Sequence, residues 1–228
     1  MVLALTLAVG LGACAYHGNF DDPVQRRVQW FSFLGGDDIK ATCQPGASGS
    51  TDRYRFVYNG RYAEQVRAYE LVGDGGGGAY LTARATGKYA NLAEVNLEDP
   101  LGPLRWKESR ATLNGATFSL FKQALAADGF LQPPKTEGQR FSSNSFYWLV
   151  SGCHEGQFHF GAWKYPSEDF QKLQFPKLLL VRDQTGMAFN PPRDAPTEIM
   201  GQPSSSEGAN APFNITIRAD GVGGGTLF

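Results

Sequence analysis

Aromatic and charged side chains alternate along residues 53–67, RYRFVYNGRYAEQVR, and this is the strongest local pattern in the chain. A period of two residues is typical of a strand with one buried face, so Tyr54, Phe56 and Tyr58 are predicted to share the core side of a sheet. The alternative is an exposed aromatic row, flanked by arginines, that stacks on a sugar or binds an anionic headgroup. We expect the core interpretation, because alternation alone requires it.

The Asn59-Gly60 pair predicts the turn of this first hairpin. Asn-Gly favours a two-residue turn of type I′, because both residues tolerate a positive φ. The resulting register places Tyr58 opposite Arg61 and Arg55 opposite Glu64. We therefore expect a cross-strand ion pair between Arg55 and Glu64.

A second hairpin is predicted from residues 145–151 and 157–164, which are rich in aromatic residues and read as paired strands around a turn at Cys153. Residues 133–138, PPKTEG, have the composition of a linker. Further segments with strand character are 79–85, 92–97, 104–113, 177–182 and 213–218.

The hydrophobic period changes at residues 116–127, where Phe118, Phe121 and Leu125 are spaced for one face of a helix. Asp128-Gly129 is typical of the end of such a helix. A second, short capped helix is expected at 166–173. Together these elements predict a mainly β or α+β fold, in which antiparallel, sandwich-like sheets carry one packed helix.

Composition agrees with a turn-rich β protein, since the 228 residues include 28 glycines and 13 prolines, with 13% aromatic residues. A chain of this length can bury one large core. The 21 basic and 22 acidic residues give a formal net charge of -1, without the basic excess of nucleic-acid-binding proteins. We expect no nucleic-acid partner.

The chain opens with an apolar run at residues 1–13 that contains no charge and no proline. The run is shorter than the roughly 20 residues of a membrane-spanning helix and is typical of a secretory signal. It ends in Leu11-Gly12-Ala13-Cys14, which resembles the lipobox of bacterial lipoproteins, where a leucine and two small residues precede the modified cysteine. The alternative is an ordinary buried strand or helix.

The lipobox resemblance implies that Cys14 carries a diacylglyceryl thioether, and that cleavage before it frees an amino group for a third acyl chain. Stable membrane attachment takes more than one acyl chain, and each buried methylene contributes about 0.8 kcal/mol. In this family the residue directly after the cysteine steers sorting. Ala15 at that position implies a protein anchored in the outer membrane and facing the periplasm.

This interpretation divides the chain into four parts. They are a signal peptide at 1–13, a lipidated tether at 14–25, a β-rich domain at 26–190 and a loosely ordered C-terminal segment at 191–228. The strand expected at 213–218 lies inside the last part.

Assigning Cys14 to the lipid leaves Cys43 and Cys153 as an even pair in an oxidising compartment. We expect them to form a disulfide, which would constrain the unfolded chain by about 4 to 5 kcal/mol. The alternatives are two separate buried thiols, or a metal site at Cys153.

His154, Glu155 and His159 follow Cys153 closely and are candidate metal ligands or catalytic groups. Their spacing fits neither a CxxC pair nor an HExxH helix. On a continuous extended strand the two histidines would point to opposite faces. We therefore expect no metal site, and a hydrolase built on these three residues would require their side chains to converge in one cleft.

The glycine-rich stretch at 73–78 matches GxGxxG, but the β-like residues 79–85 follow it where a phosphate cradle requires a helix. It is expected to be a hairpin loop, and no cofactor is predicted. The leading hypothesis is a non-catalytic lipoprotein with a structural, assembly or binding role and an envelope protein as partner. One alternative is a periplasmic ligand-binding module whose stacking platforms are Tyr54, Tyr58, Trp148 or Trp163. The other alternative is a hydrolase with a site formed by His154, Glu155 and His159.

Overall fold

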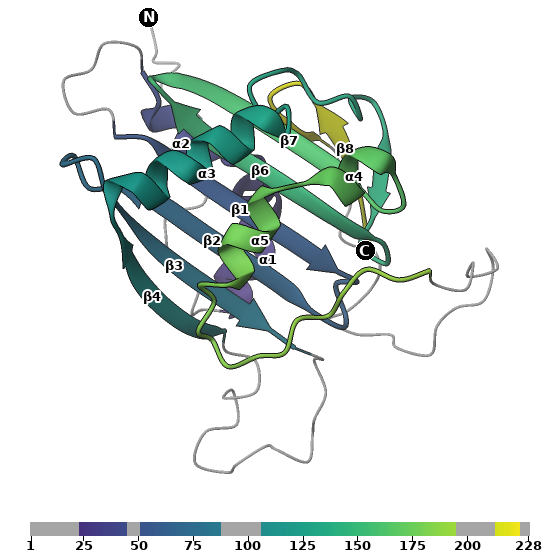
Figure 1. Cartoon of the computed structure of the whole chain (residues 1–228). Helices are drawn as coiled ribbons and strands as arrows, with labels where there is room; N and C mark the ends of the chain where they lie inside the picture. Colours follow the sequence, from purple (N-terminus) through teal and green to yellow (C-terminus); the bar gives the residue numbers. More distant parts are fainter. Residues whose placement is uncertain (1–22, 45–50, 88–105, 195–212, 224–228) are drawn as a thin grey trace, which may run out of the picture.

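The computed structural model describes residues 23–44, 51–87, 106–194 and 213–223, which fold around a six-stranded antiparallel sheet (Figure 1). The strand order is β4-β3-β2-β1-β6-β7. The strands are β1 Arg53–Gly60, β2 Val66–Gly73, β3 Ala79–Thr86, β4 Lys107–Leu113, β6 Phe146–His154 and β7 Gln157–Lys164. The prediction of a mainly β, α+β fold is confirmed.

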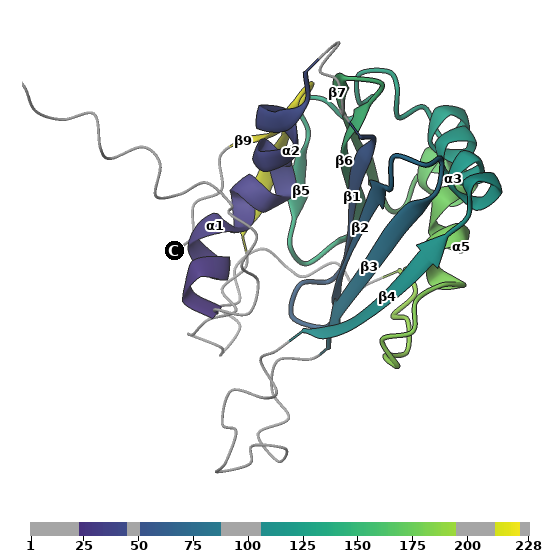
Figure 2. The ribbon, with the colours of Figure 1, turned by 90° about the vertical axis from the view of Figure 1, so that its left-hand side faces the viewer.

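The large sheet is the middle one of three layers (Figure 2). Helices α3 (Gly115–Ala127), α4 (Glu168–Lys172) and α5 (Phe175–Leu180) cover one face. The other face carries α1, α2 and a small antiparallel sheet of order β5-β8-β9. These elements are α1 Pro23–Gly35, α2 Asp37–Thr42, β5 Arg140–Ser142, β8 Asn214–Arg218 and β9 Gly221–Gly223.

An aromatic core fills the space between the large sheet and the α3 layer. Tyr54, Phe56 and Tyr58 alternate along β1, and all three are fully buried there. Phe121 of α3 and Phe175 of α5 pack on Phe56, with ring centroids 6.4 and 5.2 Å away. The prediction that these β1 aromatics form the core side of the sheet is confirmed.

Helix α3 begins one residue before the predicted range of 116–127. Its N-terminus is capped by Asn114, whose side-chain oxygen accepts a hydrogen bond from the backbone N–H three residues later at 2.9 Å. The predicted apolar face is the buried one, formed by Phe118, Phe121 and Leu125.

The first hairpin forms, but its predicted turn is wrong. Asn59 and Gly60 belong to β1, and the chain reverses direction at residues 61–65. The amide of Asn59 is buried and donates hydrogen bonds to the carbonyl oxygens of Ser143 and Ser145, at 2.9 and 2.6 Å. These two bonds hold Asn59 in the extended strand, because the side chain could not reach both carbonyl oxygens from a turn.

The longer loop shifts the register of the hairpin. Tyr58 faces Arg67, and Arg55 faces Glu70 in place of the predicted Glu64. The expected ion pair of Arg55 therefore forms with a different carboxylate, at 2.6 Å. Glu64 instead pairs with Arg61 and Arg193.

Arg55 fastens the α1 and α2 layer to the large sheet. Its side chain is 0% exposed. Both carboxylate oxygens of Asp38 in α2 accept hydrogen bonds from its guanidinium at 2.7 and 2.8 Å, and Glu70 accepts at 2.6 Å. The guanidinium also lies 4.1 Å from the centroid of the Phe33 ring in α1. Removing one of these carboxylates would destabilise the fold strongly, because the buried guanidinium would keep a charge that is no longer fully compensated.

Glu70 makes the stability of the protein sensitive to acid. Burial alone would raise its pKa, but the charges of Arg55, Arg53 and Arg84 lower the pKa of Glu70 to about 2. The carboxylate therefore stabilises the fold above its ordinary pKa, and this contribution is lost as the pH falls towards about 2. We expect the free energy of unfolding to fall by about 3 kcal/mol through this group between about pH 5 and pH 2.

Urea unfolding of the natural chain and of Glu70→Gln across this pH range tests the expectation. The stability difference between the two proteins should be largest near pH 5 and shrink towards pH 2, because the natural side chain then becomes neutral too. A difference that stays constant with pH would contradict the assignment.

The expectation of a single packed helix, with one short capped helix beside it, underestimates the helical content of the described residues. Helix α4 forms as expected, with the Ser167 hydroxyl accepting from the N–H of Phe170. Helix α5 occupies most of the segment 177–182 that was predicted to be a strand. Phe175 and Leu179 are both buried one helical turn apart, and such a short apolar run does not distinguish helix from strand by its period.

The C-terminal residues add two strands to the small sheet. β8 forms where a last strand is predicted, and β9 follows in the expected glycine-rich tail. Phe213, Ile215 and Ile217 are buried in the same core as Trp30 of α1, so this segment is an integral part of the domain. At the other end α1 already begins at Pro23, inside the predicted tether.

Several predictions fall outside the described residues. They are the signal peptide at 1–13, most of the tether, the strand at 92–97, and residues 195–212 and 224–228 of the C-terminal segment.

Candidate functional site

The second hairpin forms from β6 and β7, as predicted. Its turn consists of Glu155 and Gly156, whose φ angles of 51° and 76° are both positive, as in a turn of type I′. Cys153 is therefore part of β6 and does not form the turn. The short turn brings the side chains near the end of the hairpin close together.

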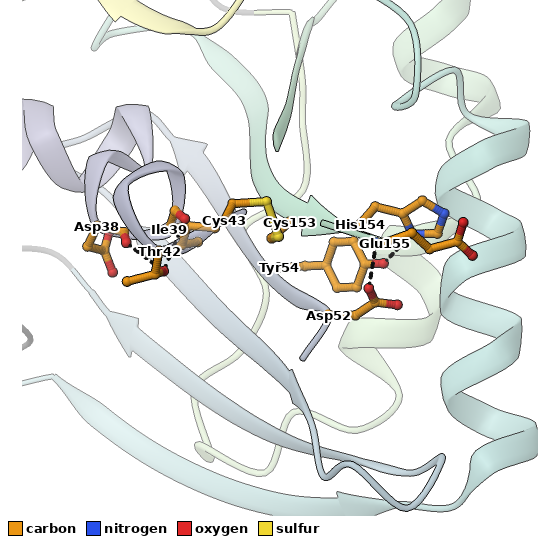
Figure 3. Close-up of a disulfide and its surroundings, with 9 residues drawn as sticks. All are labelled: Asp38, Ile39, Thr42, Cys43, Asp52, Tyr54, Cys153, His154 and Glu155. Carbon is orange, nitrogen blue, oxygen red and sulfur yellow. Dashed lines mark hydrogen bonds between the residues drawn. A yellow bond between two sulfur atoms is a disulfide. The ribbon is translucent and has the colours of Figure 1, made fainter. Parts of the chain in front are cut away.

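Cys43 and Cys153 form a disulfide (Figure 3), with their Cα atoms 5.5 Å apart. Cys43 is the C-terminal cap of α2, and Cys153 faces Arg53 across the β1–β6 pair. The bond therefore ties the end of α2 to the end of β6 in the large sheet. The predicted pairing of these two cysteines is confirmed.

Ionisable side chains gather beside the disulfide, at the end of the second hairpin (Figure 3). The Tyr54 hydroxyl lies 2.6 Å from Nδ1 of His154. The Asp52 carboxylate accepts a hydrogen bond from the backbone N–H of Glu155 at 2.8 Å and pairs with Lys122 of α3 at 3.3 Å. We call these five residues the hairpin cluster.

The Tyr54 hydroxyl stays protonated in this cluster. Burial raises the pKa of Tyr54, and the negative charge of nearby Asp52 raises it further. The ring is held between Phe118 of α3 and Phe130, with centroids 6.4 and 6.1 Å away. The hydrogen bond between the Tyr54 hydroxyl and Nδ1 of His154 links a partly exposed histidine to the aromatic core.

His154 and His159 lie on the same face of the hairpin, so the prediction that they point apart is wrong. His159 pairs with Gly152, two residues from His154 on the neighbouring strand, and the two imidazole centroids are 6.4 Å apart. Burial lowers the pKa of His159, and the nearby His154 lowers it further. Glu155 stands exposed on the turn beside them. Within the described ranges, no group of three His, Cys, Asp or Glu side chains is placed to hold a metal ion.

The four aromatic residues considered as stacking platforms are core residues. Tyr54 and Tyr58 are 0% exposed, Trp148 is 2% and Trp163 is 8% exposed. The ring of Tyr58 packs on Trp148, and its hydroxyl donates to the carbonyl oxygen of Asn190 at 2.7 Å. Trp163, the most accessible of the four, reaches the wall of a cleft.

The sequence does not mark Asp52 and Lys122 as members of the hairpin cluster. Asp52 precedes β1, and Lys122 lies one helical turn after Phe118, so each resembles an ordinary surface charge. They meet because α3 crosses the sheet near the start of β1 (Figure 1). A local signal for this contact is absent from the sequence around either residue.

Cys14 and Ala15, on which lipidation and sorting depend, precede the described residues. Among the residues with a described position, no helix combines the length and hydropathy of a membrane span. No family model, no curated protein and no solved structure matches the chain.

Proposed function

We propose that the chain is a lipoprotein of the bacterial envelope, anchored through Cys14, whose domain has a non-catalytic binding or scaffolding role. The Cys43–Cys153 disulfide carries the proposal, because it engages two of the three cysteines and leaves Cys14 for the lipid. Disulfides of this kind persist in oxidising compartments such as the periplasm. Ala15 after the cysteine favours the outer membrane, with the domain facing the periplasm.

The construction of the domain supports a binding role. Two cores, one on each face of the large sheet, and a disulfide between layers give a rigid scaffold. A rigid surface loses little conformational entropy when it binds a partner. We expect the partner to be a component of the envelope.

Cys14→Ser is expected to move the protein from the membrane fraction into the soluble fraction of a bacterial host. The reason is that the acyl chains, and no helix, would hold it at the membrane. Fractionation followed by immunoblotting measures the distribution.

The matched control is Ala15→Ser, which introduces the same side chain next to an intact Cys14 and should stay with the membrane. A Cys14→Ser protein that sediments with lipid like the natural chain would refute the anchor.

A further inference from the structure

A cleft of about 690 Å³ lies between three parts of the fold. They are the end of α3 together with the loop after it, strand β7, and helix α4. These elements lie side by side at the β7 edge of the large sheet (Figure 1). The volume falls within the roughly 300 to 1,000 Å³ of typical ligand pockets. Neither the hairpin cluster nor the disulfide contributes to its walls.

The charged side chains in the walls of the cleft are already paired. Lys135 pairs with Asp169 at 3.0 Å, and Lys172 pairs with Glu168 at 2.8 Å. Lys164 lies 5.6 Å from the centroid of the Phe141 ring. Asp128 accepts hydrogen bonds from the backbone N–H groups of Gln174 and Phe175. With Glu168 counted, three lysines and three carboxylates stand at the cleft, so its side chains carry no net charge. The electrostatics of the cleft therefore favour an uncharged ligand.

Flat apolar surfaces line the cleft on the side of β7. The indole of Trp163 lies over Gly161, where an added Cβ would overlap the ring. Tyr165 and Pro166 continue this wall, and Pro133 faces it from the loop. Aromatic rings and proline present the flat surfaces on which the C–H face of a sugar ring packs.

Three exposed glutamines, Gln132, Gln139 and Gln174, contribute uncharged polar groups to the lining. Each amide carries both hydrogen-bond donors and an acceptor. Such groups match hydroxyl and acetamido groups, which also donate and accept. The apolar wall gives the methyl group of an acetamide a place to pack.

We propose that this cleft binds an uncharged, N-acetylated oligosaccharide, the class of glycan found in bacterial cell walls. The identity of the glycan rests on the envelope location proposed above. The binding chemistry itself rests on the cleft and does not require the lipid.

Chitotetraose titrated into the full chain in mild detergent tests the proposal by calorimetry. We expect a Kd of about 1 mM or lower. The Gln132→Ala, Gln139→Ala double variant should bind about five-fold more weakly or worse, which corresponds to the loss of at least one hydrogen bond. Gln171→Ala is the matched control, because Gln171 is exposed on α4 and does not line the cleft; it should bind like the natural chain.

The indole N–H signal of Trp163 gives a readout that does not depend on the glutamine variants. The Trp163 signal should shift in ¹H–¹⁵N spectra when chitotetraose is added, while the signal of the buried Trp148 stays in place. The Trp163→Phe variant identifies the Trp163 signal, because that signal is lost from its spectrum. The proposal would be overturned if chitotetraose does not bind, or if the folded double variant binds it with an unchanged Kd. It would also be overturned if cellotetraose binds equally well, or if tetra-alanine binds in place of the sugar. A failed membrane anchor would leave these titrations unaffected, so the two proposals fail separately.

Discussion

Asp38→Asn lowers the free energy of unfolding by about 3 kcal/mol or more. The Asp38 carboxylate makes two hydrogen bonds to the guanidinium of Arg55, whose side chain is 0% exposed, and a third to Arg53. An asparagine keeps the size but loses the charge, so the buried cation is left with Glu70 as its carboxylate partner. Urea unfolding monitored by circular dichroism measures the loss.

Glu168→Gln is the control for this experiment. Glu168 pairs with Lys172 at 2.8 Å, but both side chains are largely exposed, so the change should stay within about 0.5 kcal/mol. A loss of less than about 1 kcal/mol for Asp38→Asn would mean that the Arg55 network does not hold the α2 layer on the sheet.

Replacing Cys43 and Cys153 together by serine lowers the free energy of unfolding by about 4 to 5 kcal/mol. The two residues are 110 positions apart, so the disulfide closes a large loop and removes many conformations from the unfolded chain. The end of α2 also loses its covalent attachment to β6. The same urea measurement applies, and reduction of the natural protein should reproduce the effect.

Cys14→Ser serves as the control, because it removes the third cysteine of the chain and leaves the disulfide intact. This variant should unfold at the same urea concentration as the natural domain. A double variant whose midpoint matches that of the natural chain would show that the disulfide contributes little to the stability.

The parts of the fold that depend on local patterning could be predicted from the sequence. Alternation identified β1 and its aromatic face, and a helical period identified α3 with its buried face. The expectation of a single buried face on β1 is wrong, because Arg55 and Val57 on its other face are buried as well. The error at Asn59 has a physical cause: the residue favours turns in isolation, but its amide satisfies two carbonyl groups that lie more than eighty positions along the chain. Tertiary contacts decided the register against the local preference.

The candidate site could be predicted in part. The count of cysteines was enough to pair Cys43 with Cys153, because lipidation would use the third. The hairpin cluster could not be predicted, since its members come from the start of β1 and the residue before it, from α3, and from the end of β6 with its turn. Two histidines five positions apart point to opposite faces only if one strand carries both, whereas the turn at Glu155 places His154 and His159 on the same face of two strands.

We propose that a lipid on Cys14 holds a disulfide-bonded domain at the envelope. Intact mass spectrometry of the protein purified from bacterial membranes tests it most directly. We expect a chain that begins at Cys14, carries the added mass of the acyl chains and shows no free thiol at Cys43 or Cys153. A chain with an unmodified cysteine at position 14 and residues 1–13 still attached would contradict it.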